Sequence, residues 1–293
     1  MCRALWALAP ARAVLSRLEP ILGEDLEELT TRAGKDRLAL TFNAQRAIHA
    51  HHLGHWFAFR AAHPDLPLGG AVGHSVGVVA ALVAAQVMSV EDSGVFVAER
   101  ARAFSDVCAR LPEPQGLAAV ATENLDDLIE ELPRFPGLVL ALRNSAGKGT
   151  LGGPIAELER LARVAAEEGW PLRVTPLDVE GPYHTAALAA VGPRLDRILS
   201  AITLRPPRVP VFMGTSGRAE TDPERIRELL ARQPSSPELH WEAVRAAYSH
   251  GCRRFLEIGS VPQPITWISD QLVDENGEPL PDVTTWAVKT EEL

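Results

Sequence analysis

Apolar residues recur at helical spacing through the first sixty residues of the chain. One amphipathic face extends over residues 5–21, and a second begins at Asp25, two residues after Gly23. A longer helix is predicted over residues 41–62, because the pattern ends at the His63–Pro64 pair and the residue before a proline disfavours helical backbone. The N-terminal part should therefore be a layer of helices.

The pattern changes to a strand and a helix near residue 70. The segment LGGAVGHSVGVVAALVAAQV, residues 68–87, contains a short apolar run, a glycine-rich turn at residues 73–77 and then a continuous apolar helix. A more polar helix is predicted over residues 90–111. This order predicts a buried strand that turns directly into a buried helix.

Short apolar and helical segments alternate between residues 113 and 179. The apolar runs LAAVAT and LVLALRNS each precede a helical stretch, and PLRVTPLDV supplies a further strand. This β-α-β and then α-β order fits a small split β-α-β module set into a larger α/β domain. We therefore predict an α/β fold, with a small domain at residues 113–179 and a large domain formed by residues 1–112 and 180–293.

The larger pattern resumes after residue 184. Helices are predicted over residues 188–202, 223–233 and 241–250, and strands at VPVFMG and FLEIG. A late VTTWAV strand follows near the C-terminus and says little about chemistry.

Composition and charge exclude several classes of protein. The chain has 293 residues, of which 46% are hydrophobic and 23% charged, as is typical of a globular protein. Its 29 basic and 38 acidic residues give a net charge of −9, which argues against a nucleic acid or an anionic membrane as partner. No apolar run is long enough to span a bilayer, and arginines interrupt the N-terminal apolar stretch, so we expect neither a membrane segment nor an export signal.

The cysteines point to a reducing compartment. Cys2, Cys108 and Cys252 are too few and too scattered for a disulfide framework or a zinc site. We therefore expect a cytoplasmic protein without a metal centre.

Residues 73–77, Gly-His-Ser-Val-Gly, match the G-x-S-x-G pattern of a nucleophile elbow. In such an elbow the glycines allow a sharp strand-to-helix turn, and the serine hydroxyl projects at the helix N-terminus. Ser75 would then be the nucleophile, and the Val76 amide would donate to an oxyanion, assisted by the helix dipole. The alternative is a glycine-rich turn that binds a phosphate or nothing at all.

A serine nucleophile needs a base, and the chain has nine histidines. His51 and His55 are four residues apart on a helix, as metal ligands would be, but a solvated helix face explains them better because no third ligand is evident. His184 differs, because it follows a strand in a Gly-Pro loop that opens a helix, where active-site residues of α/β folds gather. We therefore favour His184 as the base.

Several spaced motifs together resemble one known family. They are GHSVG, Arg100 in VAERARAF twenty-five residues later, the segment NSAGKGTLGGP, and a histidine in a P-x-H-T-like loop. Their combination, over about residues 1–272, is similar to the malonyl-CoA:acyl-carrier-protein transacylase family, which includes the acyltransferase domains of fatty-acid and polyketide synthases. The resemblance implies an α/β-hydrolase-like large domain with an inserted ferredoxin-like small domain.

The resemblance also implies roles for particular residues. Ser75 would be acylated, and His184 would be its general base, held by the main-chain carbonyl of Gln233 rather than by a carboxylate. Arg100 would pair with the free carboxylate of a malonyl-type group through its planar fork. The alternative for Arg100 is an exposed helical arginine beside Glu99 and Arg102. The remaining residues expected to bind substrate are Gln45, Asn144 and His74.

The sequence departs from the family pattern at three places. The family normally begins with a strand and a glycine-glutamine-glycine loop whose glutamine supplies a second oxyanion donor, whereas MCRALW matches the helix that follows this loop. Val78 replaces the glutamate usually found after the elbow. The segment Gly181-Pro182-Tyr183 before the histidine matches neither the malonyl nor the methylmalonyl pattern, so the acyl group stays open.

The implied reaction is a transfer of a malonyl-type group from coenzyme A to the phosphopantetheine thiol of an acyl carrier protein, through an acyl-serine intermediate, in fatty-acid or polyketide biosynthesis. We expect no cofactor and a monomeric chain. Two alternatives remain: an acyl-thioester hydrolase that edits carrier proteins, and a non-catalytic module that docks a carrier protein.

Overall fold

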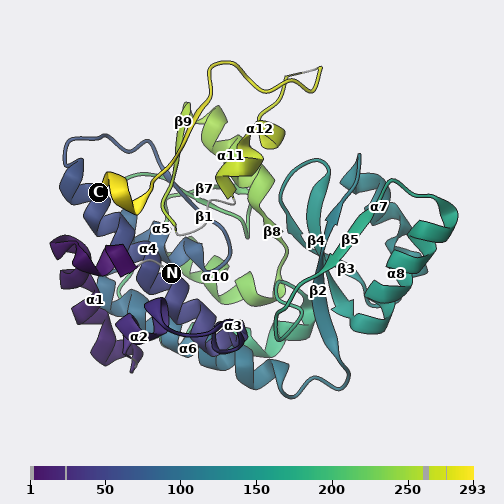
Figure 1. Cartoon of the computed structure of the whole chain (residues 1–293), viewed down its shortest axis with the longest axis horizontal. Helices are drawn as coiled ribbons and strands as arrows, with labels where there is room; N and C mark the ends of the chain where they lie inside the picture. Colours follow the sequence, from purple (N-terminus) through teal and green to yellow (C-terminus); the bar gives the residue numbers. More distant parts are fainter. Residues whose placement is uncertain (1–2, 24, 260–263, 275) are drawn as a thin grey trace.

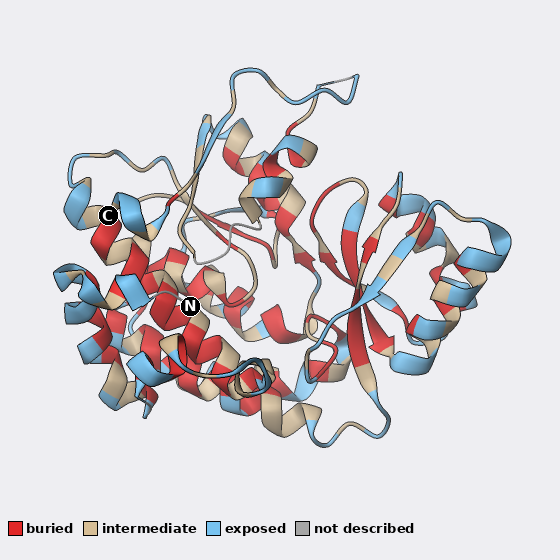
Figure 2. Cartoon of the chain, viewed as in Figure 1, coloured by how far each residue is buried: buried red, intermediate tan, exposed pale blue. Residues whose placement is uncertain are grey.

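The computed structural model describes residues 3–23, 25–259, 264–274 and 276–293. It has a mixed α/β fold in which helices and small sheets form one larger part, and a separate five-stranded sheet with its helices lies beside it (Figure 1). Figure 2 shows buried residues concentrated around α4 and α5 in the larger part and along the strands of the five-stranded sheet.

The N-terminal helices form a layer with an apolar core of its own. Core residues of α1, such as Leu15 and Leu18, pack with residues of α2, α4 and α6. The αL conformation of Gly23 ends α1, and the Asp25 side chain accepts a 2.7 Å hydrogen bond from the Glu28 amide at the start of α2. The elements are η1 (Arg3–Ala7), α1 (Ala9–Leu22), α2 (Leu26–Thr31), α3 (Lys35–Ala39) and α4 (Thr41–Ala62).

The next elements carry the glycine-rich turn and a short sheet. They are β1 (Ala71–Gly73), α5 (Gly77–Ala84) and α6 (Val90–Cys108), joined later in the chain by β6 (Val211–Met213) and β7 (Arg218–Glu220). β1 pairs in parallel with β6, and β6 pairs antiparallel with β7. Both β1 and α5 were predicted from the alternation of apolar and glycine residues. The apolar residues of α5 and β6 meet in one core with those of α6 and α9.

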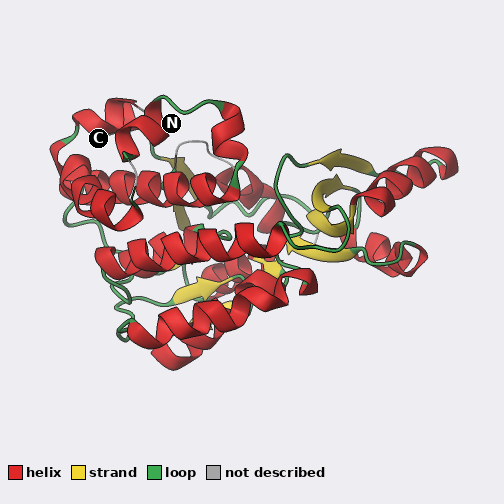
Figure 3. Cartoon of the chain, turned by 90° about the horizontal axis from the view of Figure 1, so that it is seen from below, coloured by secondary structure: helices red, strands yellow, loops and turns green. Residues whose placement is uncertain are grey.

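The five-stranded sheet has the strand order β5-β2-β4-β3-β8. Its elements are β2 (Gln115–Ala121), α7 (Leu125–Glu131), η2 (Leu132–Arg134), β3 (Val139–Arg143), β4 (Lys148–Pro154), α8 (Ile155–Glu168), β5 (Arg173–Pro176) and, from much later in the chain, β8 (Glu238–Leu239). The helices α7 and α8 share an apolar core with β2 and β4. In the view of Figure 3 this unit projects from the helices of the larger part.

The remaining elements complete the larger part. They are η3 (Ala186–Val191), α9 (Gly192–Ala201), α10 (Pro223–Arg232), η4 (Gln233–Ser235), α11 (His240–Ser249), β9 (Arg254–Glu257), η5 (Pro264–Trp267), α12 (Ile268–Gln271), β10 (Thr284–Ala287) and η6 (Thr290–Glu292). The strands β9 and β10 pair in parallel as a separate two-stranded sheet. Among the described residues, no helix is both long and apolar enough to cross a membrane.

The structure differs from the sequence-based prediction in several elements, among them β8, which was not predicted, the strand β4 and the helix after His184. No strand was predicted in the motif NSAGKGTLGGP, but the structure has a turn there and then the central strand β4, whose glycine-rich sequence hides a strand pattern. The helix predicted over residues 188–202 is divided into η3 and α9, because Leu188 has non-helical backbone angles and Gly192-Pro193 starts a new helix.

Candidate active site

Ser75 lies in the tight turn between β1 and α5. Its φ is +50°, a strained backbone conformation for a serine that is found where the surrounding structure enforces it. A side chain at Gly73 would overlap the backbone of Val78, so the turn requires glycine there. A Cβ at Gly77 would instead meet the His52 ring at an ordinary 3.6 Å. The steric requirement of the elbow therefore rests on Gly73.

The Ser75 hydroxyl is hydrogen-bonded to a histidine from a distant part of the chain. The distance from Ser75 Oγ to His184 Nε2 is 2.8 Å. His184 is buried, lies in the loop between β5 and η3, and also has a positive φ, +62°. Its backbone N–H donates to the Pro234 carbonyl at 2.9 Å, which anchors the loop. The two atoms are close enough for a proton to pass from the serine hydroxyl to the histidine ring.

The other nitrogen of His184 faces a main-chain carbonyl. Nδ1 is 3.1 Å from the carbonyl oxygen of Gln233, the first residue of η4. A carbonyl can only accept, so Nδ1 carries the proton and Nε2 is left free to accept one. Burial, with the nearby Arg100 and His74, lowers the pKa of His184 to about 3, so the ring is neutral at neutral pH.

The side chain of Gln233 links the elbow to Arg100. Its Nε2 donates to the Ser75 carbonyl at 3.0 Å, and its Oε1 accepts from Arg100 Nη2 at 3.1 Å. Arg100 also donates through Nη1 to the amide oxygen of Gln45 on α4. Five of the predicted residues are thus joined in one hydrogen-bonded chain: Ser75, His184, Gln233, Arg100 and Gln45.

Arg100 lies on α6 and is almost completely buried, with 1% of its surface exposed. The alternative of an exposed helical arginine is therefore wrong, although its neighbours Glu99 and Arg102 do form an exposed ion pair. Burial lowers the pKa of Arg100 to about 10, so it stays charged at neutral pH. Its guanidinium lies 4.3 Å from the centre of the Phe104 ring, and its Nε has no hydrogen-bond partner among the described residues. A buried guanidinium with an unused N–H suits an anionic ligand.

His74, the residue before Ser75 in the elbow, contacts Asn144. His74 Nε2 is 3.2 Å from Asn144 Oδ1, and the Asn144 carbonyl accepts from Gln271 Nε2 at 2.6 Å. The His74 ring contacts the rings of His240 and Trp267, with centroids 5.1 Å and 5.4 Å away, and its burial lowers its pKa. Because Asn144 follows β3, this contact joins the five-stranded sheet to the elbow.

The Val76 amide stands at the start of α5. Within the described part of the chain, no group accepts a hydrogen bond from it. Unused amides at a helix N-terminus attract negative charge, helped by the helix dipole. The position therefore fits the oxyanion donor that the sequence predicts there.

Glu238 was not singled out from the sequence, yet it lies in the middle of this site. The side chain is completely buried in β8, and its Oε1 accepts from the Ser75 amide at 3.3 Å. Its Oε2 is 3.4 Å from Gln233 Nε2 and 4.0 Å from His184 Nδ1. Burial raises the pKa of Glu238 to about 7. The only available sequence signal was a glutamate five residues after Gln233, and no periodicity marked it as buried.

The prediction that His51 and His55 lie on a solvated face of α4 is wrong. His51 and His55 are both buried, their ring centroids are 4.2 Å apart, and His55 Nε2 is 2.8 Å from Thr290 Oγ1. The helix is covered on this side by the C-terminal segment, which the spacing of the histidines could not reveal. Among the described residues, no three His, Cys, Asp or Glu side chains are grouped to hold a metal ion. Cys2 lies outside the described residues, and Cys108 and Cys252 are free thiols.

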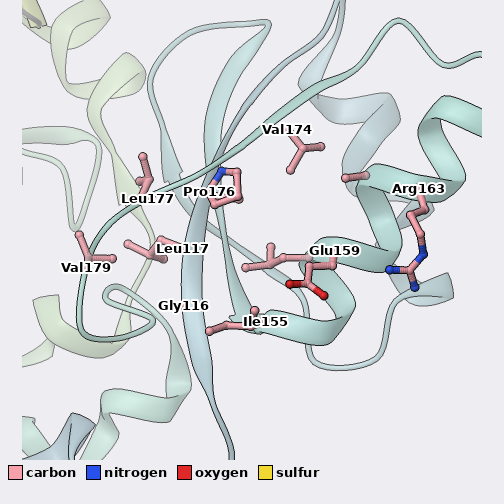
Figure 4. Close-up of a pocket in the computed structure, with 12 residues that line it drawn as sticks. Gly116, Leu117, Ile155, Glu159, Arg163, Val174, Pro176, Leu177 and Val179 are labelled. Atoms are coloured by element: carbon pink, nitrogen blue, oxygen red, sulfur yellow. The ribbon is translucent and has the colours of Figure 1, made fainter.

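A separate hollow of about 360 Å³ lies between α8 and the strands β2 and β5 (Figure 4). Its lining is mostly apolar, with Ile155 and Leu177 at its edge and the charged Glu159 and Arg163 on α8. None of the predicted site residues lines it. This hollow is therefore distinct from the site around Ser75 and His184, which lies where the larger part of the fold meets the five-stranded sheet.

A family model for the acyl transferase domain matches residues 1–286. The chain therefore belongs to the acyl transferase domain family, which confirms the resemblance inferred from its motifs. The malonyl CoA-acyl carrier protein transacylase of Bacillus subtilis (strain 168) is 28% identical to it over 267 residues, covering 88% of this chain and 82% of that protein.

Solved structures share the fold. The crystal structure of MCAT from Mycobacterium tuberculosis superposes with a TM-score of 0.86 at 24% identity, covering 97% of this chain and 90% of that one. A malonyl-transacylase in complex with a type II PKS acyl-carrier protein gives a TM-score of 0.82 at 24% identity, covering 96% of this chain and 88% of that one. The α/β fold predicted from the sequence is thus confirmed.

Proposed function

We propose that this chain transfers a malonyl group from malonyl-CoA to the thiol of an acyl carrier protein through an ester on Ser75. The observation that carries the proposal is the hydrogen-bonded series of Ser75 Oγ, His184 Nε2, His184 Nδ1 and the Gln233 carbonyl, in a member of the acyl transferase domain family. The malonyl donor and the carrier protein are supported by the Bacillus subtilis relative.

The first half of the reaction acylates the serine. His184 Nε2 takes the hydroxyl proton as Ser75 Oγ forms a bond to the thioester carbonyl carbon. When the tetrahedral intermediate collapses, the carbon–sulfur bond breaks and the proton on Nε2 passes to the departing coenzyme A thiolate. The products are the acyl-serine ester and free coenzyme A.

The negative charge on the intermediate needs stabilisation. The Val76 amide and the N-terminus of α5 supply a preorganised donor and a favourable dipole beside Ser75. The second half then runs in reverse, with the phosphopantetheine thiol of the carrier protein giving its proton to His184 and attacking the ester. All bonds are made and broken by groups of the chain and its two substrates, so this reaction calls for no metal or redox cofactor.

Arg100 would recognise the free carboxylate of the malonyl group. It is buried and charged, it is held by Gln45 and Gln233, and its Nε has no partner among the residues described. A planar guanidinium binds a carboxylate through two parallel hydrogen bonds, which an acetyl group cannot use. His74 and Asn144, which contact each other beside Ser75, would line the path of the thioester.

We also propose the finer division of the fold that the sequence predicted. The strand order β5-β2-β4-β3, with its β-α-β-β-α-β chain order, supports a ferredoxin-like small domain at residues 113–179. The strand–elbow–helix of β1 and α5 supports an α/β-hydrolase-like large domain formed by residues 1–112 and 180–293. The cytoplasmic location and the monomeric state stay predictions.

The test is an intact-mass measurement after incubation with malonyl-, methylmalonyl- or acetyl-CoA, with and without a holo acyl carrier protein. We expect a stable malonyl adduct on the enzyme that disappears only when the carrier protein is added. An adduct that returns rapidly to the free enzyme without carrier would indicate a hydrolase instead. If none of the three donors gave an adduct, both the transferase and the hydrolase function would be contradicted, and the non-catalytic docking module would be the remaining alternative.

A further inference from the structure

Among the described residues, Glu238 is the acidic side chain that is hydrogen-bonded to the Ser75 amide, yet the reaction proposed above does not use it. Its carboxylate is completely buried and reaches Ser75 N, Gln233 Nε2 and His184 Nδ1 at 3.3, 3.4 and 4.0 Å. Removing a carboxylate from water is strongly unfavourable unless charges or hydrogen bonds compensate it. These hydrogen bonds are long, so the carboxylate is only partly compensated when His184 is neutral.

The surrounding backbone is shaped to receive this side chain. Glu238 begins β8, which pairs in parallel with β3 through Leu142, and this fixes the direction of the strand. Gly214, just after β6, lies directly against the carboxylate, and a Cβ at this position would overlap Glu238 Oε1. The side chain is therefore held from the five-stranded sheet and from the small sheet of the elbow at once.

Among the described residues, the ionisable groups Arg100, His184 and His74 are linked to the carboxylate directly or through a neighbour. Arg100 on α6 is connected to it through the Gln233 amide, which accepts from the arginine and donates to the glutamate. His184 presents Nδ1 from the loop after β5, and His74 lies beyond Ser75 on the elbow and lowers the pKa of His184 by charge repulsion. Of these, only His184 changes its charge in the proposed reaction.

We infer that Glu238 is a positioning residue for acyl transfer, whose carboxylate stabilises the protonated ring of His184 while Ser75 attacks the thioester. The inference rests on the proposed function and deepens it. The proton moves from Ser75 Oγ to His184 Nε2 and then to the leaving thiolate, and Glu238 neither gains nor loses one. The Glu238 carboxylate lies 4.0 Å from His184 Nδ1. Its negative charge attracts the positively charged imidazolium, which exists only after the ring has taken the serine proton and before it gives this proton to the thiolate.

In a Ser-His-Asp triad one carboxylate both orients the histidine ring and stabilises its charge. Here the Gln233 carbonyl would orient the ring and Glu238 would stabilise the charge. The carbonyl oxygen, 3.1 Å from Nδ1, sets the tautomer and orientation of the ring, but it carries no full charge. The carboxylate of Glu238 supplies the charge from slightly farther away. Loss of charge alone should therefore reduce the rate less than the roughly 10⁴-fold seen when a triad carboxylate is replaced and the tautomer is wrong.

The inference predicts a particular pH dependence. Burial raises the pKa of Glu238 to about 7, whereas that of His184 is lowered to about 3. Between pH 5.5 and 8.5, roughly one unit or more on either side of the Glu238 pKa, the carboxylate ionises while the histidine stays neutral. The acylation rate of the natural enzyme should therefore rise with pH through neutrality.

The experiment compares Glu238→Gln, Glu238→Asp and Glu242→Gln in single-turnover acylation by malonyl-CoA across this pH range. Glu242, four residues along on α11, is a half-buried glutamate outside the site and serves as the matched control. We expect Glu238→Gln to be about 10- to 100-fold slower at high pH and to lose the neutral-pH rise. Glu238→Asp keeps the charge and should keep the rise at a reduced rate, and Glu242→Gln should match the natural enzyme.

Two outcomes overturn the inference. An unchanged rate and profile in Glu238→Gln would show that the charge is not used, and a lower rate with the neutral-pH rise intact would show a merely structural residue. Thermal unfolding of each variant checks that it is folded. A natural enzyme that forms no acyl-serine at all would contradict the proposed function instead, so the two failures are distinguishable.

Discussion

The partners of the His184 ring determine what this residue can do. The carbonyl of Gln233 holds the proton on Nδ1, and Ser75 Oγ lies 2.8 Å from the basic Nε2. Burial keeps the ring neutral, because its pKa is lowered to about 3. A neutral, oriented imidazole is the form that a general base requires.

Replacing His184 with alanine should therefore slow acylation by about 10²- to 10⁴-fold without unfolding the protein. The measurement is the single-turnover rate of adduct formation, with circular dichroism to verify the fold. His250→Ala is the control, since this residue lies exposed at the end of α11 and should leave the rate unchanged. A comparable loss in the control, or none in His184→Ala, would make the assignment of the base wrong.

Arg100 should decide which acyl group is accepted. Arg100→Ala should lose malonyl transfer relative to acetyl transfer by about 10- to 100-fold, the value of a charge-assisted pair, because only the malonyl group has a carboxylate to bind. Arg100→Lys should recover little, since an ammonium lacks the planar fork. The comparison is kcat/KM for the two acyl-CoAs, with the exposed Arg102→Ala as control. Equal losses on both substrates would indicate that Arg100 only supports Gln45 and Gln233.

At the level of elements, the elbow between β1 and α5 depends on one of its two glycines. Gly73→Ala should destabilise the fold by about 3 kcal/mol or more, because the added Cβ would overlap the backbone of Val78. Gly77→Ala should stay within about 1 kcal/mol of the natural protein, because its Cβ would meet only His52 at 3.6 Å and alanine suits a helix. Urea unfolding of the pair measures both values. Similar losses at the two positions would mean that the turn is not built as described.

Some elements were predicted correctly from the sequence because the local pattern of residues is enough to determine them. The periodicity of α8 and the glycine-serine-glycine turn at Ser75 are local features, and both are where the pattern predicts them. The strand β4 was missed because its glycines pack against neighbours such as Leu125 and Thr185, and this close packing is decided by the tertiary structure. Glu238 was missed for the same reason, since its partners are as far as 163 residues away in the chain.

At the scale of the whole molecule, buried histidines should control stability in acid. Seven of the nine have a lowered pKa, mainly through burial: His49, His51, His52, His55, His74, His184 and His240. Unfolded histidines bind protons near pH 6.5, whereas His49 and His51 when folded do so only near pH 3 and 2. The unfolded chain therefore takes up more protons in acid than the folded chain. The contribution of these histidines to the free energy of unfolding is fully present above pH 6.5 and decreases as the pH falls below it.

We expect the free energy of unfolding to fall between pH 6.5 and about pH 4, by at most about 1.4 kcal/mol per pH unit for a histidine that takes up its proton only in the unfolded chain. Glu238 acts in the opposite direction, because its raised pKa makes the folded state lose stability as the pH rises from 4.5 to about 7, but it is a single group. His51→Leu should make the acid loss shallower, and the exposed His250→Leu should not. Urea unfolding at several pH values measures the slopes, and a constant stability down to pH 4.5 would contradict this account.

The whole account depends on Ser75 carrying the acyl group between its two substrates. The most direct measurement is a rapid-quench time course with malonyl-CoA and then holo carrier protein, in which intact mass and peptide mapping follow the enzyme and the carrier together. We predict that one malonyl group appears on the peptide that contains Ser75, that it leaves when the carrier is added, and that malonyl-carrier appears in equal amount, with none of these events in Ser75→Ala. Malonyl-carrier formed by Ser75→Ala at the natural rate, or an adduct mapped to another residue, would contradict the account.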